Sequence, residues 1–195
     1  MTQKMGHLSA QVTRSAVRSI KVTAEGDIGD YIESLGTFAT VGILTESIGE
    51  QINYVNAEFV AKERGIEIVN QVAPNTSGFN NKVKIKLTTQ GSTITIAGTV
   101  FEENVQRIIE TDEYVLDVEP KGNMIFFRNT DTPGVVGDVG RIIADNQLNI
   151  SDFRLGRDNK GQALAVVRVD GQVTRGVIEQ LAGLEACISV SHAAL

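Results

Sequence analysis

The N-terminal part of the chain switches between helical and strand-like hydrophobic spacing. Met5, Leu8, Val12 and Ala16 recur every three or four residues, which predicts an amphipathic helix over residues 1–17. The same two spacings predict a strand over 19–24 and then a helix around 38–48, which Gly49 ends and whose recurring hydrophobic residues are Phe38, Val41, Leu44 and Ile48. A helix between Asn56 and Gly65 that buries Phe59 and Val60, and a strand over 66–69, follow. We therefore expect this part of the chain to combine helices with a sheet.

A β-hairpin is the clearest feature of the next segment. The predicted elements are a polar loop over 74–81, a strand over 83–87, a turn at 90–92, a returning strand from 94 to 101, and short strands over 107–111 and 114–118. Lys82, Lys84 and Lys86 alternate with the hydrophobic residues of the first hairpin strand, so we expect them to form its solvent-exposed face. Pro120-Lys121-Gly122 interrupts the pattern and predicts a domain boundary.

Beyond this boundary the spacing predicts the order βαββαβ. The elements are a strand over 124–128, a helix from 135 to about 146, strands over 149–156 and 162–169, a helix around 177–181, and a strand over 186–190. Such a unit forms an antiparallel sheet with both helices on one face. The predicted fold class is α+β, with a mixed α/β domain followed by a ferredoxin-like βαββαβ domain. The other face of the sheet and its edges are then uncovered, and we expect dimerisation to cover them.

Composition and charge narrow the classes of function. The net charge of -6 argues against a broad surface for nucleic acid or anionic membranes, so small molecules and protein partners are expected instead. The single cysteine, Cys187, excludes an intrachain disulfide and a cysteine-based metal site on this chain, and it fits a reducing, cytoplasmic location. No apolar run reaches the roughly 20 residues that span a bilayer, and residues 1–11 lack the apolar core of a secretory signal.

The loop from Asn129 to Gly134 carries the most informative chemistry. Asp131 or Thr132 can cap the helix that follows, Pro133 suits its first turn, and Gly134 lets a ligand approach the backbone. The free N–H groups and the dipole of a helix start favour an anion such as the carboxylate of an amino acid. Asn129 and Asp131 then face its ammonium or hydroxyl group. The alternative is that Asp-x-Pro-Gly serves turn and capping chemistry alone.

The order of these motifs resembles a known family. Residues 123–195 resemble an ACT domain, and the chain as a whole resembles the C-terminal regulatory half of the long form of D-3-phosphoglycerate dehydrogenase. Three segments of the first part carry this resemblance beside the Asp-x-Pro-Gly loop: Val55-Asn56-Ala57, Ala61-Lys62-Glu63-Arg64-Gly65-Ile66 and Ala97-Gly98-Thr99-Val100-Phe101. The domains expected from it are a linker helix over 1–14, an allosteric substrate-binding-like domain over 15–119, and the ACT domain over 123–195.

The resemblance implies feedback inhibition by L-serine or a related amino acid, bound between two ACT domains of a homo-oligomer. The implied ligand contacts are Asn129, Asp131, Gly134 and Val135 of one subunit, with Asn149 of the other. Relatives often have histidine or tyrosine at the position of Asn129, so an amino acid in general is a firmer expectation than serine. Arg107 resembles a position implicated in binding an anionic effector, and a solvated surface arginine is the alternative for it.

No catalytic site is expected on this chain. The glycines Gly134, Gly137 and Gly140 lack the spacing of a Rossmann phosphate loop, so NAD is expected only on a catalytic part outside the chain. His7 and His192 lack a partner motif and are expected to be ordinary residues. Two other functions stay open. One is the β-type regulatory region of an iron-sulfur L-serine dehydratase, and the other is a stand-alone amino-acid sensor.

Overall fold

The computed structural model describes residues 1–49, 51–75 and 78–195, which form two compact units. The first unit comprises Met1–Asp112 and the second Glu113–Leu195. The sequence predicted a boundary at residues 120–122, whereas the division into compact units falls between Asp112 and Glu113. The strand over 114–118 therefore belongs with the second unit, where it packs on the sheet described below.

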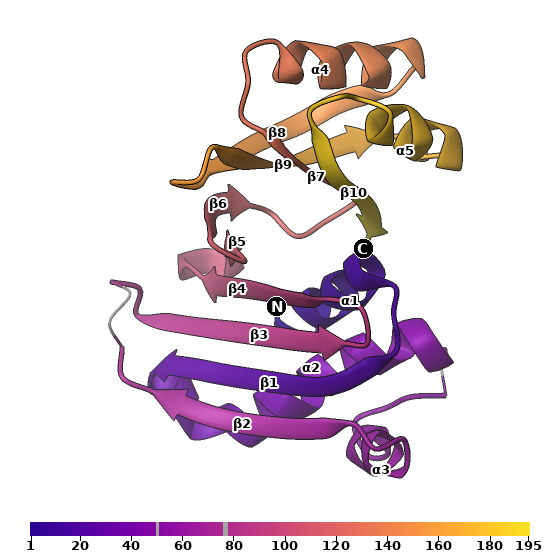
Figure 1. The fold of residues 1–195 in the computed structure, drawn as a ribbon. Coiled ribbons are helices and arrows are strands. Elements are labelled where there is room, and N and C mark those ends of the chain that lie inside the picture. The colour runs from indigo at the N-terminus through magenta and orange to yellow at the C-terminus, as the bar shows by residue number, and fades with distance from the viewer. Residues whose placement is uncertain (50, 76–77) are drawn as a thin grey trace. The chain divides into compact units, whose positions relative to one another are not determined.

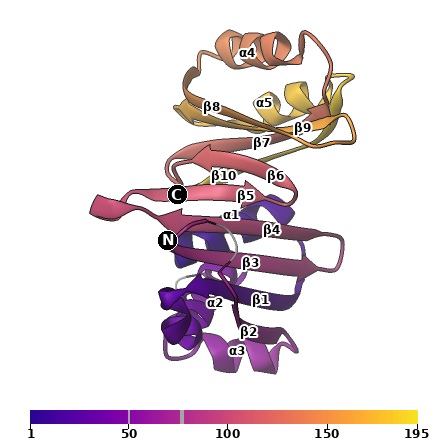
Figure 2. The same ribbon diagram turned by 90° about the vertical axis from the view of Figure 1, so that its left-hand side faces the viewer.

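The first unit is a sheet with helices on one face (Figures 1 and 2). Its elements are α1 (Thr2–Thr13), β1 (Val17–Gly26), η1 (Asp27–Tyr31), α2 (Ile32–Ile48), α3 (Ala57–Glu63), β2 (Glu67–Ala73), β3 (Asn81–Thr89), β4 (Thr93–Val100), η2 (Glu102–Asn104) and β5 (Gln106–Thr111). Its strands lie in the order β2-β1-β3-β4-β5, in which β1 and β2 are parallel and the other pairs are antiparallel. Helices α1 and α2 pack on each other and on these strands.

The register of the strands explains why the helices cover one face. Ile20, Val22 and Ala24 of β1 lie opposite Leu87, Ile85 and Val83 of β3, and all six are buried. Because side chains alternate across a strand, directly opposed residues share a face. The hydrophobic alternation that predicted these strands therefore marks the face that α1 and α2 cover.

Three expectations about the first unit were wrong. Helix α3 buries Ala57 and Ala61, whereas Phe59, expected in the core, is 63% exposed. Phe38 of α2 is also partly exposed and stacks edge-on with Tyr54 at 5.3 Å between ring centroids. Lys82, expected on a wet face, is buried.

Other parts of the pattern were confirmed with changed limits. Helix α1 ends at Thr13, because Arg14 takes the left-handed conformation with φ 45°. Gly65, with φ +68°, follows the end of α3 as the sequence predicted for a helix terminator. The polar loop predicted over 74–81 includes residues 76–77, which lie outside the described residues.

The second unit confirms the βαββαβ order. Its elements are β6 (Tyr114–Val118), β7 (Asn123–Thr130), α4 (Val135–Asp145), β8 (Asn149–Arg157), β9 (Gln162–Asp170), α5 (Arg175–Ala182) and β10 (Cys187–Ala194). The antiparallel sheet has the order β10-β7-β9-β8, which leaves β8 at one edge. Figure 1 shows α4 and α5 on one side of this sheet.

One hydrophobic core holds this unit together. It joins α4 and α5 to the inner residues of β7 and β9: Val135, Val139 and Ile143 of α4; Val177 and Leu181 of α5; Ile125 and Phe127 of β7; Ala165, Val167 and Val169 of β9. Strand β6, which precedes the βαββαβ elements, packs on β8 and β9. Among the helices of the described residues, none is long and apolar enough to cross a membrane.

Candidate functional site

The loop before α4 forms the wall of a pocket. Gly134 precedes the helix with φ +98°, a conformation that L side chains rarely adopt. In the described chain, no side-chain hydrogen bond caps this helix, so the expected caps Asp131 and Thr132 do not fill that role. The first-turn N–H groups of α4 therefore keep their capacity to bind an anion.

The pocket has a volume of about 430 Å³ and lies entirely within the second unit. Its lining combines the loop and the start of α4 with the helix-covered face of the sheet: Phe127, Asn129, Asp131, Thr132, Pro133, Gly134, Val135, Val136, Val139, Phe153, Leu155, Arg157 and Ala165. Four of the five residues expected to bind the ligand, Asn129, Asp131, Gly134 and Val135, are thus brought together. The lining is apolar except for the groups near the loop.

Asn129 is the most unusual residue of the pocket. It is only 3% exposed, and its Nδ2 donates a hydrogen bond to the carbonyl oxygen of Thr130 at 2.7 Å. Its Oδ1 is buried and has no hydrogen-bond partner among the described residues. Leaving a buried acceptor without a donor costs about 1–3 kcal/mol. A ligand that donates a hydrogen bond to this oxygen removes that cost.

A charged pair lies at the same end of the pocket. Arg157 Nε donates to Asp131 Oδ2 at 2.9 Å, and the Arg157 side chain is 66% exposed. Asp131 is held in place through its backbone, because its N–H donates to the carbonyl oxygen of Gly161 at 2.9 Å. An exposed pair of this kind contributes little to stability, so its groups can exchange partners at small cost.

Two expected site residues lie elsewhere. Asn149 is the first residue of β8, at the opposite end of that strand from Arg157, and its Nδ2 contacts Asp170 Oδ2 at 3.3 Å. It does not line the pocket of its own chain. Arg107 belongs to β5 of the first unit, where its Nη1 donates to the carbonyl oxygen of Gln106 at 3.0 Å.

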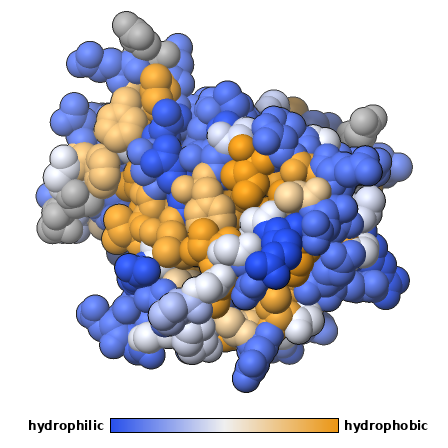
Figure 3. All heavy atoms as spheres, turned by 90° about the horizontal axis from the view of Figure 1, so that it is seen from above, coloured by the Kyte–Doolittle hydropathy of each residue, from blue (hydrophilic) through white to orange (hydrophobic). Residues whose placement is uncertain are grey.

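The sequence analysis missed the contribution of β8. Arg157 lies just beyond the strand predicted over 149–156, and no role was expected for Phe153 or Leu155, yet all three residues line the pocket. Their alternation along one strand was the available signal, because residues two apart face the same side of a sheet. Leu155 and Val136 are partly exposed. Figure 3, a view from above, shows hydrophobic side chains gathered on this face of the molecule among hydrophilic ones.

Comparisons with known proteins agree with the two-unit organisation. A family model for the D-3-phosphoglycerate dehydrogenase intervening domain matches residues 1–112, and a model for the ACT domain matches residues 123–186. The chain is 32% identical to the D-3-phosphoglycerate dehydrogenase of Bacillus subtilis over 96% of its own length and 36% of the relative. It is 30% identical to the D-3-phosphoglycerate dehydrogenase of Archaeoglobus fulgidus, over 100% of the chain and 38% of the relative. It is 26% identical to that of Synechocystis, over 93% of the chain and 33% of the relative. The chain thus spans 33% to 38% of the length of these relatives.

Proposed function

The chain belongs to the D-3-phosphoglycerate dehydrogenase family and comprises the family's intervening domain and an ACT domain, and from this we propose that its second unit binds an amino acid for feedback control. The ligand that we propose is L-serine. The buried, unpartnered Oδ1 of Asn129 carries this proposal, because it needs a hydrogen-bond donor from outside the described chain. An α-ammonium group is such a donor.

The other groups of the pocket complement the rest of an amino acid. Asp131 supplies a negative charge beside Asn129, which favours the ammonium group. The first-turn N–H groups of α4 and the guanidinium of Arg157 favour the carboxylate. The apolar floor of Phe127, Val139 and Ala165 excludes water and strengthens these charged contacts.

The proposal includes a second copy of the chain. Strand β8 lies at the edge of the sheet, and edge strands are available for pairing with another chain. Antiparallel pairing of two β8 strands around a two-fold axis brings the start of one strand next to the end of the other. The partner's Asn149 then approaches Arg157 and the pocket, which accounts for its absence from the pocket of its own chain.

At the level of the whole protein, we propose that binding of the ligand inhibits a phosphoglycerate dehydrogenase activity that serves serine biosynthesis. The NAD-dependent reaction then belongs to the portion of the protein outside this chain. The relatives named above are all phosphoglycerate dehydrogenases, which favours a regulatory part of that enzyme over a dehydratase region or a stand-alone sensor.

Calorimetric titration with L-serine tests the site directly. We expect Asp131→Asn to weaken binding about 10- to 100-fold, because a hydrogen bond to a charged group contributes about 1.5–3 kcal/mol. Asp138→Asn is the matched control, since it removes the same charge from the first turn of α4 outside this pocket. Wild-type protein that gives no heat with millimolar L-serine contradicts the proposed ligand.

Asn129→Leu separates ligand binding from a purely structural role. It keeps a similar volume and removes the buried oxygen, so we expect it to abolish detectable binding while leaving the thermal midpoint unchanged or higher. A variant that loses stability and binding together indicates that Asn129 serves the turn through its bond to Thr130.

A further inference from the structure

Strands β7 and β8 carry the pocket on one face and β6 on the other. Phe127 and Asn129 of β7 line the pocket, and Arg128 between them contacts Tyr114 of β6. Leu155 and Arg157 of β8 also line the pocket, and Gly156 between them faces β6. Because successive side chains of a strand point to opposite faces, a shift of either strand end moves both sets of contacts together. A single sheet thickness therefore separates the pocket wall from β6.

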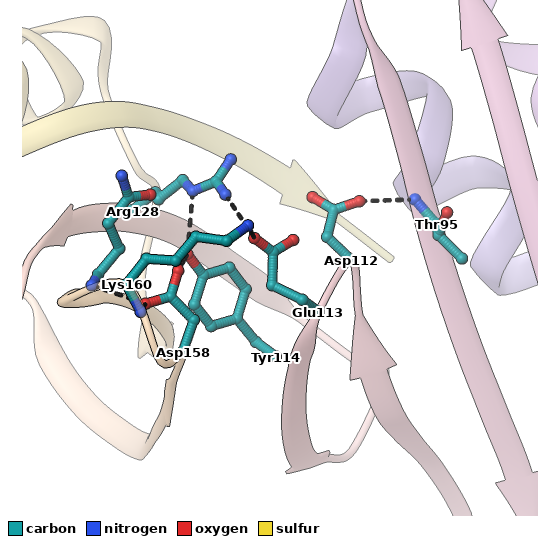
Figure 4. Close-up of polar contacts among 8 residues, drawn as sticks. Thr95, Asp112, Glu113, Tyr114, Arg128, Asp158 and Lys160 are labelled. Carbon is teal, nitrogen blue, oxygen red and sulfur yellow. Dashed lines mark hydrogen bonds and ion pairs between the residues drawn. The ribbon is translucent and has the colours of Figure 1, made fainter.

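Tyr114 is the centre of the polar contacts on the β6 side (Figure 4). It is 1% exposed, its hydroxyl accepts a hydrogen bond from Arg128 Nε at 3.1 Å, and it lies 3.3 Å from Asp158 Oδ2, to which it donates. The Arg128 guanidinium also lies over the Tyr114 ring, 5.4 Å from its centroid. Burial raises the pKa of Tyr114, so its hydroxyl stays protonated and remains a donor. Both partners of this hydroxyl are the chain neighbours of pocket residues, Asn129 and Arg157.

Gly156 allows β6 to approach β8 closely. A Cβ atom at this position would lie 2.8 Å from the carbonyl oxygen of Val115 and 3.0 Å from Tyr114 Cβ. Separations this short force a shift of the neighbouring backbone. The contact between β8 and β6 therefore depends on shape as well as on the polar groups around Tyr114.

Asp112 and Glu113 are consecutive residues on either side of the division between the two units. Asp112, the last residue of the first unit, accepts a hydrogen bond from the Thr95 N–H at 2.9 Å through its Oδ1 and donates its own N–H to the Thr95 carbonyl oxygen at 2.7 Å. Glu113, the first residue of the second unit, pairs with Arg128 Nη2 at 3.2 Å. Each side of the Asp112–Glu113 peptide bond is thus anchored within its own unit, as Figure 4 shows.

We propose that β6 senses the state of the amino-acid pocket and that Tyr114 couples the two through Arg128 and Asp158. The identity of the ligand in this inference rests on the proposed function. A carboxylate that draws Arg157 away from Asp131 moves the end of β8, including Gly156 and Asp158. The position of β6 on β8 then depends on pocket occupancy.

Hydrogen–deuterium exchange of the amides of residues 114–118 tests this coupling. We expect Tyr114→Phe to speed their exchange about 30-fold, because it removes two hydrogen bonds that each contribute on the order of 1 kcal/mol. L-Serine is expected to slow exchange at these amides in the wild type and to do so at least threefold less in Tyr114→Phe. Calorimetry should show that Tyr114→Phe binds L-serine within about threefold of the wild type, since Tyr114 lies outside the pocket lining.

A ligand-free comparison decides on the coupling even if L-serine does not bind. Asp131→Asn removes the negative charge that pairs with Arg157 on the pocket side. It should change exchange at residues 114–118 at least threefold in the wild-type background and not in the Tyr114→Phe background. Glu179→Gln is the control, because it breaks an exposed pair with Arg175 on α5. Absence of heat with L-serine overturns the proposed ligand. Amide exchange at residues 114–118 that is unchanged by Asp131→Asn overturns the coupling.

Discussion

Replacing Gly42 with alanine is expected to lower the free energy of unfolding of the first unit by about 1–3 kcal/mol, although alanine is the better helix former. Helices α1 and α2 cross with their backbones in contact at Gly6 and Gly42. A Cβ atom on Gly42 would lie 2.1 Å from the Gln3 carbonyl oxygen, and one on Gly6 would lie 2.5 Å from the Ala39 carbonyl oxygen. Because backbone atoms rather than flexible side chains occupy the space, the helices must separate, and that separation disturbs the core beneath them.

Gly140→Ala in α4 is the matched control. It is also a glycine inside a helix, but no neighbouring atom lies within 4 Å of its added Cβ. Alanine should therefore stabilise the second unit by about 0.5–1 kcal/mol through helix propensity alone. Urea unfolding followed by circular dichroism, with amide exchange assigning the change to one unit, measures both effects. Equal changes of the same sign in the two variants contradict a tight crossing of α1 and α2.

The second unit was predictable because its helices have one clear buried stripe. In α4 the buried residues Val135, Val139 and Ile143 follow helical spacing, and β9 presents a nearly continuous run of buried residues. These patterns give the element order, and the order in turn gives the fold. Local spacing sufficed here because both helices pack on a single sheet face.

The first unit was less predictable because small residues decide its packing. Helix α2 begins at Ile32, earlier than expected, and buries Gly36, Ala39 and Gly42 along with its larger residues. The helical periodicity was read from large hydrophobic residues, so it predicted Phe38 to be buried, whereas Phe38 is exposed. The close approach of α1 to α2 requires small residues where the two helices cross. The spacing of small residues in a sequence does not indicate which helix or sheet they contact.

The grouping of the candidate site residues around one pocket was predictable as far as it depends on one loop. Asn129, Asp131, Gly134 and Val135 are near in sequence, so their convergence follows from a strand, a turn and a helix start. Arg157 joins them only because β7, β9 and β8 pair in a particular register, which places Asn129 opposite Ala163 and Ala163 opposite Arg157. The role proposed for Asn149 requires a second chain, so it remains a prediction.

Removing the charge of Glu110 is expected to destabilise the first unit by about 2 kcal/mol, because it leaves the buried Lys82 without its nearest partner. Lys82 is 5% exposed, and its Nζ lies 2.7 Å from Glu110 Oε1 and 3.8 Å from Glu25 Oε1. The value stays below the full loss of about 3–5 kcal/mol for a wholly buried pair, since the Glu110 side chain is 27% exposed and Glu25 remains. Urea unfolding of Glu110→Gln at neutral pH measures the loss.

Lys84→Ala provides the contrast within the same cluster. Lys84 Nζ lies 3.3 Å from Glu110 Oε2, but its side chain is 36% exposed. Exposed pairs typically contribute under about 1 kcal/mol, so this variant should be nearly neutral. Similar losses in Glu110→Gln and Lys84→Ala would show that total charge, rather than the burial of Lys82, determines the stability of the cluster.

Acidification should remove the difference between wild type and Glu110→Gln. Burial opposes the charged form of Glu110, but hydrogen bonds and charges from Lys82 and Lys84 outweigh it and hold the pKa below its ordinary value. A carboxyl whose pKa is lower in the folded state contributes stability above its unfolded pKa, about 4.3 for glutamate, and loses that contribution as the pH falls through the folded value. The gap between the two proteins should therefore be constant from pH 7 to about 5 and narrow below that. A gap that stays constant into acid means that the carboxylate charge does not stabilise the fold, and that the introduced glutamine side chain disturbs packing instead.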